Sequence, residues 1–317
     1  MTEPKILFAG TPEIAVPLLR ALAKDFHVVG VLTNCDRSVG RSKALVPSPV
    51  KQTALELGLP VLQFDTLKGP ARQAVRELGA DTLISFAFGK IFGPMFLDLF
   101  PNGRFNVHPS ALPLFRGPSP IQSTIHSGLE SCTISLQNIG LGMDEGDIWG
   151  TFDFPLTGSE STQALTQKVS EVVAQSVPGL LRDIIDQKVQ SHAQEGEATY
   201  CQMIGREDGN LDFSKTAREL HCQIRACYPW PKAWAKANGM DIAITGVWGG
   251  FDELSASDSC DGIEPGTVVA FRKDRGIGIA CSDKVLWVTA LQLPSKKEMD
   301  YKSFVNGNQW ILKARFE

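Results

Sequence analysis

The sequence predicts an α/β protein: a Rossmann-like, mainly parallel but mixed sheet with helices on both faces, followed by a small all-β, OB-like barrel. Three observations support this fold class. In the first half of the chain, short apolar runs alternate with segments of helical periodicity. The first two runs flank one such helix, which makes a right-handed βαβ unit and parallel strands. Near the C-terminus, short strand-like runs are separated by glycine turns, a pattern typical of small barrels.

Composition bounds the class of protein before any motif is considered. The 317 residues are 43% hydrophobic and 21% charged, which suits a globular protein of two domains. The net charge of −4 excludes a generally basic nucleic-acid coat, although a local basic surface stays open. No apolar run is long enough to cross a membrane, and strand-like residues follow the N-terminus too closely for a secretory leader. We therefore expect a cytoplasmic protein.

The seven cysteines contain no C-x-x-C pair, so we expect neither a zinc site nor a disulfide framework.

The first strand is predicted over residues 5–9, and a helix then runs to about Lys24 before a second strand over residues 27–33. Gly10 follows the first strand, but the G-x-G-x-x-G fingerprint is missing. We therefore do not expect NAD to be a cofactor.

A long loop is predicted over residues 34–51, after the second strand. It carries Arg37, Arg41, Lys43 and Lys51, opposed only by Asp36. Loops of this length without structure of their own are usually functional or disordered. Two interpretations stay open at this point: a solvated surface loop, or a clamp for an anionic substrate such as an RNA backbone.

The remaining elements of the first domain follow from periodicity and turn residues. Further helices are predicted over residues 49–57, 69–78 and 161–185, and further strands over residues 61–63, 82–86, 103–107, 131–137 and 147–154.

A polar stretch with three glycines, residues 190–209, is predicted to be an interdomain linker. It separates a first domain (1–189) from a second domain (210–317). The second begins with a helix over residues 214–227 and continues with strands over 242–248, 266–271, 276–281 and 284–291. From residue 210 onward there are 14 Lys and Arg against 13 Asp and Glu, whereas the preceding residues carry 17 against 22. This mildly basic half is compatible with nucleic-acid binding.

Asn106 and His108 are the most informative polar pair in the chain. They stand two residues apart in a predicted strand, so their side chains share one face. Prolines 109, 113 and 118 then end the strand and stiffen the loop. Ligands of open α/β sheets bind at the carboxyl ends of strands. The pair alone could also be a buried Asn and His satisfied by their neighbours.

Asp144 supplies a third polar group, in a glycine-rich acidic loop after the next strand. Sequential strands tend to be neighbours, so the three side chains could meet at one end of the sheet. No nucleophile elbow is present, and no cysteine is obviously placed beside His108. An amide can stabilise an oxyanion, an imidazole can move a proton, and a carboxylate can fix its tautomer. This trio suits attack of an amine on a carbonyl.

These motifs resemble the folate-dependent formyltransferase family. The resemblance rests on N-x-H at residues 106–108, S-A-L-P-x-x-R-G at 110–117 and D-x-G-D at 144–147, and it covers nearly the whole chain in the family's order. The opening FAGTP, the basic loop CDRSVGRSKALVPSPVK and the segment RACYPWPKAW resemble the members that act on tRNA. The resemblance implies transfer of the formyl group of 10-formyltetrahydrofolate to the α-amine of methionyl initiator tRNA.

The resemblance also implies roles for individual residues. Asn106 and His108 would stabilise the tetrahedral oxyanion and assist proton transfer, and Asp144 would position His108. The folate site would be formed by Ser110, Ala111, Leu112 and Pro113, with Phe86, Phe88 and Gly89 contributing backbone at the pterin edge. Arg37, Arg41 and Lys43 would belong to the loop that contacts tRNA, and the C-terminal barrel would bind tRNA as well. We expect a monomer without a metal.

Two other functional classes stay open. One is a formyltransferase that acts on a sugar-nucleotide amine, or a hydrolase that releases formate, on the same scaffold. The other is a catalytically silent RNA-binding module, in which the Asn, His and Asp trio would be incidental. The basic loop and the predicted barrel argue against the first class, and an assay of formyl transfer separates all of them.

Overall fold

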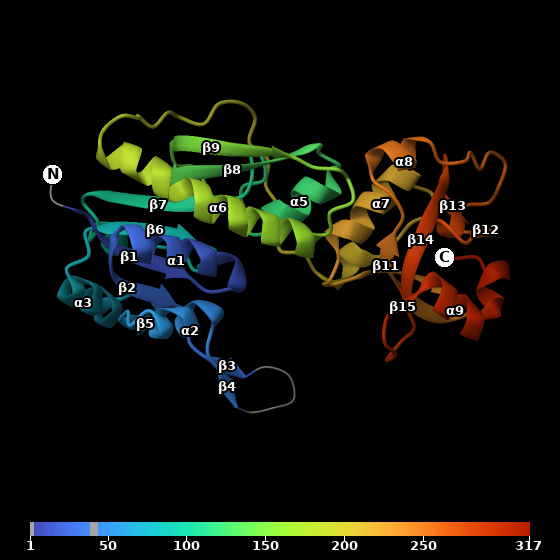
Figure 1. The fold of residues 1–317 in the computed structure, drawn as a ribbon, viewed down its shortest axis with the longest axis horizontal. Helices are drawn as coiled ribbons and strands as arrows, with labels where there is room; N and C mark the ends of the chain where they lie inside the picture. The colour runs from blue at the N-terminus through green and yellow to red at the C-terminus, as the bar shows by residue number, and fades with distance from the viewer. Residues whose placement is uncertain (1–2, 39–43) are drawn as a thin grey trace. The chain divides into compact units, whose positions relative to one another are not determined.

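The computed structural model describes residues 3–38 and 44–317, whose arrangement is drawn in Figure 1. Packing divides the chain into two compact units. The N-terminal unit comprises residues 1–118, 133–153 and 166–201, and the C-terminal unit comprises residues 119–132, 154–165 and 202–317. Residues 119–132 and 154–165 belong to the C-terminal unit although they lie within the first predicted domain. These units describe packing, so the predicted domain boundaries stay a prediction.

A seven-stranded sheet forms the centre of the N-terminal unit, with the strand order β5-β2-β1-β6-β7-β8-β9. All pairs from β5 to β7 are parallel, whereas β8 runs antiparallel to β7. The predicted mixed sheet is therefore confirmed. The strands are β1 (Lys5–Gly10), β2 (His27–Thr33), β5 (Val61–Gln63), β6 (Thr82–Phe86), β7 (Gly103–His108), β8 (Ser131–Asn138) and β9 (Ile148–Pro155).

Helices cover both faces of this sheet. The first face holds α1 (Val16–Asp25) and α6 (Thr162–Ile185), seen in front of the strands in Figure 1. The hydroxyl of Ser170 on α6 donates to the carbonyl of Ile14, just ahead of α1, which places both helices on one face. On the other face, α3 (Gly69–Leu78) and α4 (Pro94–Leu97) pack Val75 and Phe96 against Leu7 of β1. Successive side chains of a strand point to opposite faces, so the buried residues of β1 contribute to the packing on both sides of the sheet.

The basic loop after β2 contains more structure than its sequence suggests. Two short exposed strands, β3 (Arg37–Ser38) and β4 (Leu45–Val46), pair with each other, and α2 (Pro49–Glu56) begins at the residue predicted for that helix. The helix starts at Pro49 because the Ser48 hydroxyl accepts a hydrogen bond from the Lys51 amide at 3.1 Å and so caps it. The prediction that this loop has no structure of its own was therefore wrong, because β3 and β4 lie within it.

The C-terminal unit is built on α7 (Ala217–Ala226) and an antiparallel sheet of order β10-β11-β14-β13-β12, with β15 added to β14. All four predicted strands are present, whereas β10 and β15 were not predicted. The strands are β10 (Ala233–Ala237), β11 (Met240–Val247), β12 (Val268–Arg272), β13 (Gly276–Ala280), β14 (Val285–Gln292) and β15 (Met299–Asp300). The shorter elements are η1 (Glu13–Ala15) in the N-terminal unit, and α5 (Pro120–His126), α8 (Phe251–Ser255), α9 (Tyr301–Gly307), η2 (Arg206–Gly209) and η3 (Gln309–Lys313) in the C-terminal unit.

The helix α7 starts three residues later than predicted because Thr216 and Glu219 form a capping box. Its buried face joins the core of this unit, where Leu220 and Ile224 pack with Ile244, Ile279 and other sheet residues. Strand pairing among the described residues does not close this sheet into a ring, so the observed structure is an antiparallel all-β sheet.

The end of the chain lies along both edges of that sheet. Phe316 donates its amide to the Gly266 carbonyl at 2.9 Å, beside β12. Glu317 and Lys236 exchange two backbone hydrogen bonds, of 2.8 and 3.1 Å, beside β10. The Phe316 side chain is buried and packs near Phe213. These contacts hold the C-terminal segment in place without a named strand.

Candidate active site

The strand β7 carries the Asn106 and His108 side chains into the middle of the N-terminal sheet. Asn106 pairs with Ser85 of β6 and Gln137 of β8, and His108 pairs with Ser135 of β8. Their two-residue spacing puts both side chains on the same face, as the sequence predicts. His108 is 4% exposed at the carboxyl end of its strand, where the chain turns into the loop that begins at Pro109.

The loop between β8 and β9 brings Asp144 to this strand end. Asp144 has a φ of 52°, a left-handed conformation that is uncommon outside glycine. The return of the loop needs Gly146, because a Cβ there would lie 1.8 Å from the Asn138 carbonyl oxygen. The backbone is thus bent to aim one carboxylate back at the sheet.

The Asp144 carboxylate is the centre of the site. Its Oδ1 accepts from Gln137 Nε2 at 2.8 Å and lies 3.4 Å from Asn106 Nδ2. Its Oδ2 accepts from the Gly117 amide at 2.9 Å. The same Oδ1 lies 3.6 Å from His108 Nδ1, and the Asp144 side chain is only 16% exposed. The three residues predicted from the sequence therefore come together, with Gln137 and the Gly117 amide as additional members.

His108 is held as a neutral imidazole. Burial lowers the pKa of His108 below its ordinary value of 6.5, although the Asp144 carboxylate and the Phe115 carbonyl act in the opposite direction. His108 Nε2 lies 2.9 Å from the Phe115 carbonyl oxygen, which can only accept. We therefore assign the proton to Nε2. The unprotonated Nδ1 then faces Asp144 and can accept a proton.

The segment after β7 supports the site mainly from within. Ser110 is buried, its hydroxyl donates to the Leu114 carbonyl, and its own carbonyl accepts from Ser135 Oγ at 2.7 Å. Leu112 and Pro113 are buried and joined by a cis peptide bond, whereas Ala111 is partly exposed. Of the predicted folate contacts in this segment, Ala111 has the most accessible side chain.

The turn after β6 presents backbone rather than aromatic side chains. Phe86 is a buried strand residue, and Phe88 stacks on Phe92 in the core with ring centroids 5.3 Å apart. Between and after them, Ala87 and Gly89 are exposed and have φ angles of 52° and 81°. The Phe88 carbonyl accepts from Asn34 Nδ2 at 3.0 Å, which fixes the turn.

The predicted tRNA loop is only partly described. Arg37 lies on β3 and is exposed, as a phosphate contact would need to be. Arg41 and Lys43 lie outside the described residues. In the part of the chain that the structure describes, no group of three metal-ligating side chains occurs, and no helix is long and apolar enough to cross a membrane.

The side chains that support the loop carrying Asp144 were not predicted from the sequence. Arg116 Nη2 and Nε donate to Gln194 Oε1 at 2.8 and 3.2 Å, and Arg116 also forms an ion pair with Glu145 at 3.4 Å. Gln194 lies in the stretch predicted to be a linker, and it contacts a loop 50 residues away in the chain. No local pattern signals such a contact, although the Arg-Gly pair at residues 116–117 could have directed attention to it.

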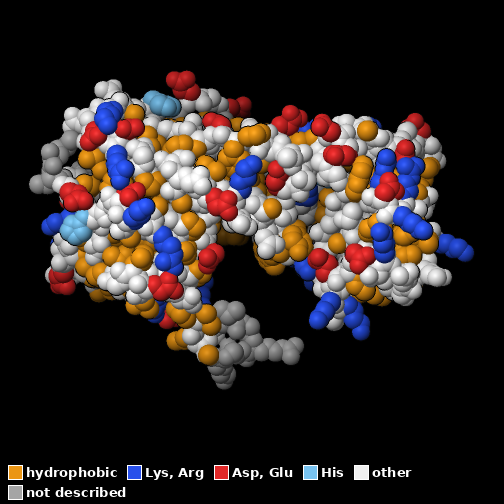
Figure 2. All heavy atoms as spheres, in the orientation of Figure 1, with side chains coloured by type: hydrophobic (Ala, Val, Ile, Leu, Met, Phe, Trp, Pro, Cys, Tyr) orange, Lys and Arg blue, Asp and Glu red, His pale blue; other side chains and the backbone are white. Residues whose placement is uncertain are grey.

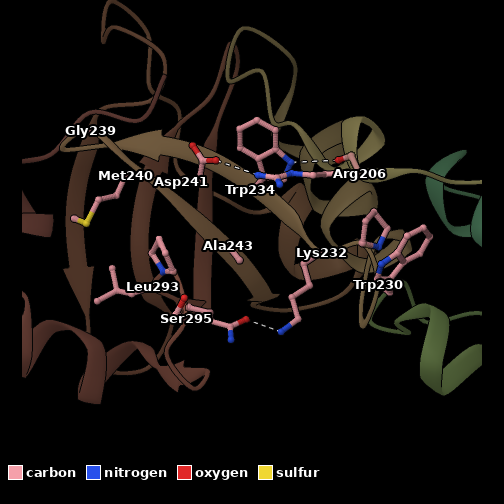
Figure 3. Close-up of a pocket in the computed structure, with 13 residues that line it drawn as sticks. Arg206, Trp230, Lys232, Trp234, Gly239, Met240, Asp241, Ala243, Leu293 and Ser295 are labelled. Atoms are coloured by element: carbon pink, nitrogen blue, oxygen red, sulfur yellow. Dashed lines mark hydrogen bonds and ion pairs between the residues drawn. The ribbon is translucent and has the colours of Figure 1, made fainter. Parts of the chain in front are cut away.

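A separate groove of about 710 Å³ lies in the C-terminal unit, between β10, β11 and the loop after β14. Figure 3 shows Trp230 and Trp234 beside the cations of Arg206 and Lys232. Trp230 is 61% exposed, and the Arg206 guanidinium lies 5.6 Å from the centroid of the Trp234 ring. Arg206 also pairs with Asp241 at 3.2 Å. This groove combines exposed aromatic surface with positive charge.

Comparison with known proteins identifies the class to which this fold and site belong. The profile described as "Formyl transferase" matches residues 4–181, and the profile described as "Formyl transferase, C-terminal domain" matches residues 203–309. The chain belongs to the formyl transferase family.

Within this family, similarity over the whole chain is to proteins named methionyl-tRNA formyltransferase. One from Treponema pallidum is 40% identical over 326 residues, covering 98% of each chain, and one from Treponema denticola is 35% identical over 322 residues, covering 99% of each. The crystal structure of an N-formyltransferase from Helicobacter canadensis matches 93% of this chain and 100% of its own with a TM-score of 0.66. Its 19% sequence identity supports the shared fold alone.

Proposed function

We propose that this protein transfers the formyl group of 10-formyltetrahydrofolate to the α-amino group of methionyl initiator tRNA. The observation that carries the proposal is the convergence of Asn106, His108 and Asp144 at one strand end. It is supported by similarity over the whole chain to methionyl-tRNA formyltransferases. The amine of the aminoacyl ester forms a bond to the formyl carbon, and the bond between that carbon and the folate nitrogen breaks. Tetrahydrofolate then leaves, and its nitrogen takes up the proton that the amine has lost.

His108 is suited to proton transfer. Its neutral ring already donates Nε2–H to Phe115, so it has no second N–H to offer an oxyanion in this state. Its Nδ1 can take the proton that the amine loses on attack. The resulting imidazolium would face the Asp144 carboxylate across the 3.6 Å separation between Nδ1 and Oδ1. Asp144 thereby stabilises the charged ring, whereas the Phe115 carbonyl holds the neutral ring in the Nε2–H tautomer.

Asn106 is suited to stabilise the oxyanion. Its Nδ2 lies 3.4 Å from Asp144 Oδ1, a long contact for a hydrogen bond. The amide can therefore turn toward developing negative charge without giving up a strong partner. A positioned amide donor of this kind typically contributes about 10²–10³ in rate.

The surroundings of Asp144 fit a flat, partly apolar folate. Leu141 and Met143, in the Asp144 loop, are 72% and 53% exposed. Exposed apolar side chains beside a polar centre are typical of small-molecule sites. We propose that this loop, Ala111 and the backbone of residues 87–89 contact the folate, while Ser110, Leu112 and Pro113 hold the wall behind it.

The C-terminal unit is the second proposed contact with tRNA, in addition to Arg37, Arg41 and Lys43. Figure 2 shows Lys and Arg side chains gathered on the visible face of this unit, interspersed with Asp and Glu. Exposed Trp230 offers a surface on which a base can stack, and Arg206 and Lys232 lie in the same groove.

We further propose that the C-terminal segment bridges β12 and β10, so that the sheet behaves as an OB-like barrel.

The direct test is incubation of the purified protein with 10-formyltetrahydrofolate and methionyl initiator tRNA, with formyl-methionyl-tRNA as the measured product. We expect formylation that depends on both substrates. A sugar nucleotide with a free amine and a reaction without acceptor serve as parallel arms. Formylation of the sugar alone, release of formate alone, or tRNA binding without product would each contradict the proposal and select one of the alternatives.

A further inference from the structure

The stretch between α6 and the C-terminal unit is part of the wall of the candidate site. We call residues 192–201 the anchoring segment. At its start, His192 and Ile148 of β9 exchange backbone hydrogen bonds of 2.8 and 2.9 Å. At its end, the Arg116 amide donates to the Thr199 carbonyl at 2.9 Å, and Cys201 donates back to Arg116 at 2.8 Å. The segment is therefore fixed along two loops of the site.

Gln194 is the side chain through which this segment reaches Asp144. Its Nε2 donates to the main-chain carbonyls of Asp144 and Gly146, at 2.8 and 2.9 Å. Its Oε1 accepts both hydrogen bonds from Arg116. One half-buried amide thus uses both ends and ties together the two loops that surround the carboxylate.

The Asp144 loop requires such support. A residue other than glycine at a φ of 52° is held in place by its surroundings rather than by its own preference. Removal of the Gln194 amide would leave two partly buried carbonyls without that donor. The loop would then relax and shift the carboxylate relative to His108.

The anchoring segment also fixes the partners of the other site groups. Thr199 Oγ1 accepts from the Phe115 amide at 2.9 Å, and the carbonyl of Phe115 is the acceptor for His108 Nε2. Gly117, which donates to Asp144, has a φ of 117°, and a Cβ there would lie 2.4 Å from the Cys201 carbonyl oxygen. The packing of residues 199–201 therefore fixes the Phe115 carbonyl, which accepts from His108, and the Gly117 amide, which donates to Asp144.

We propose that Gln194 is a positioning residue that holds Asp144, and through it His108, in the geometry required for formyl transfer. This inference rests on the proposed function. Gln194 does not take part in the chemistry itself. A displacement of about 1 Å in such a group can cost about 100-fold in rate, so the effect belongs in kcat and not in substrate binding.

The test compares Gln194→Leu with the wild type and with Glu195→Leu, its exposed neighbour in the sequence. We expect Gln194→Leu to lower kcat about 30- to 100-fold while KM for each substrate changes less than about threefold. Glu195→Leu should stay close to wild type. If Gln194→Leu is not folded at the assay temperature, Gln194→Glu replaces it, because it keeps the volume and the Arg116 contact but turns the donor into an acceptor.

A second measurement needs no catalysis. In ¹⁵N NMR of the histidine rings, with His108 assigned by loss of its signals in His108→Asn, Gln194→Leu should change the His108 tautomer balance or titration midpoint. Kinetics within threefold of wild type, a rise in KM equal to the loss, or an unchanged His108 spectrum would overturn the inference. The wild-type arm tests the proposed function separately, because an inactive wild type with a shifted His108 in Gln194→Leu refutes the function and not the positioning role.

Discussion

His108 has only one ring nitrogen free for chemistry. The Phe115 carbonyl takes the proton on Nε2, so the lone pair on Nδ1 is left facing Asp144. A neutral ring in this tautomer is a proton acceptor, and burial keeps it neutral by lowering its pKa. The role of His108 as a proton acceptor follows from its hydrogen bond to Phe115, seven residues later in the chain. The N-x-H motif does not predict that bond.

This assignment predicts the titration of His108. The lowered pKa means that the ring gains a proton only below its ordinary value of 6.5. We expect an NMR midpoint below 6.5 and the Nε2–H tautomer above it. Below about pH 6.5 the unfolded chain binds more protons than the folded one at this site, so stability falls as the pH is lowered through that window. A midpoint at or above 6.5, or an Nδ1–H tautomer, would contradict the assignment.

At the scale of elements, a helix or strand could be predicted from the sequence where the residues that define it are close together in the chain. The strands β2 and β6 and the helix α3 have the predicted boundaries, because their apolar patterns and turn residues are local. The strand β10 follows a Pro-Trp-Pro sequence, and α5 begins within a Pro-Ser-Pro sequence, so proline concealed both. Proline at the first turn of a helix is favourable, which explains why α5 forms nevertheless.

The candidate site shows the same limit. Asn106, His108 and Asp144 could be found because the first two lie at the end of a strand, the third lies in the loop after the next strand, and each carries distinctive chemistry. Gln194 could not, because its importance comes from hydrogen bonds to residues 144 and 146, and the polar stretch around it has the composition of a linker. Arg37 could be placed at an exposed hairpin only by the structure.

The proposed barrel predicts slow amide exchange at Glu317 and Lys236. Each of these residues donates a backbone hydrogen bond to the other. If the C-terminal segment closes the sheet, hydrogen exchange at these two amides should be slowed about as strongly as in β13. The amide of Asp258, in the stretch that follows α8, serves as a reference. Exchange at Glu317 as fast as in that reference would argue against closure.

At the scale of the whole molecule, the two units suggest a division of labour. The N-terminal unit holds the candidate trio, and the C-terminal unit offers an aromatic, cationic groove that a small formyl acceptor would not need. A partner as large as tRNA gives this second unit a purpose. That the protein is a monomer, and that it acts in the cytoplasm, stay predictions.

The groove predicts a selective defect in Trp230→Ala. Loss of one stacking platform should weaken binding of methionyl-tRNA by about 5- to 150-fold, the equivalent of 1–3 kcal/mol, with folate affinity unchanged. Filter binding at one fixed salt concentration measures the tRNA affinity. Leu312→Ala is the matched control, since Leu312 is 38% exposed in the same unit. Equal tRNA affinities for the two variants would exclude Trp230 from the contact.

The central claim is that the Asp144 carboxylate, beside neutral His108, makes the transfer possible. The most direct measurement is single-turnover formylation of methionyl initiator tRNA by Asp144→Asn. The variant keeps the size of the side chain but sets an amide against the donors Gln137 and Gly117, and it cannot stabilise an imidazolium. We predict a rate at least about 1,000-fold lower with folate binding changed less than about threefold. A rate within tenfold of the wild type would contradict the account.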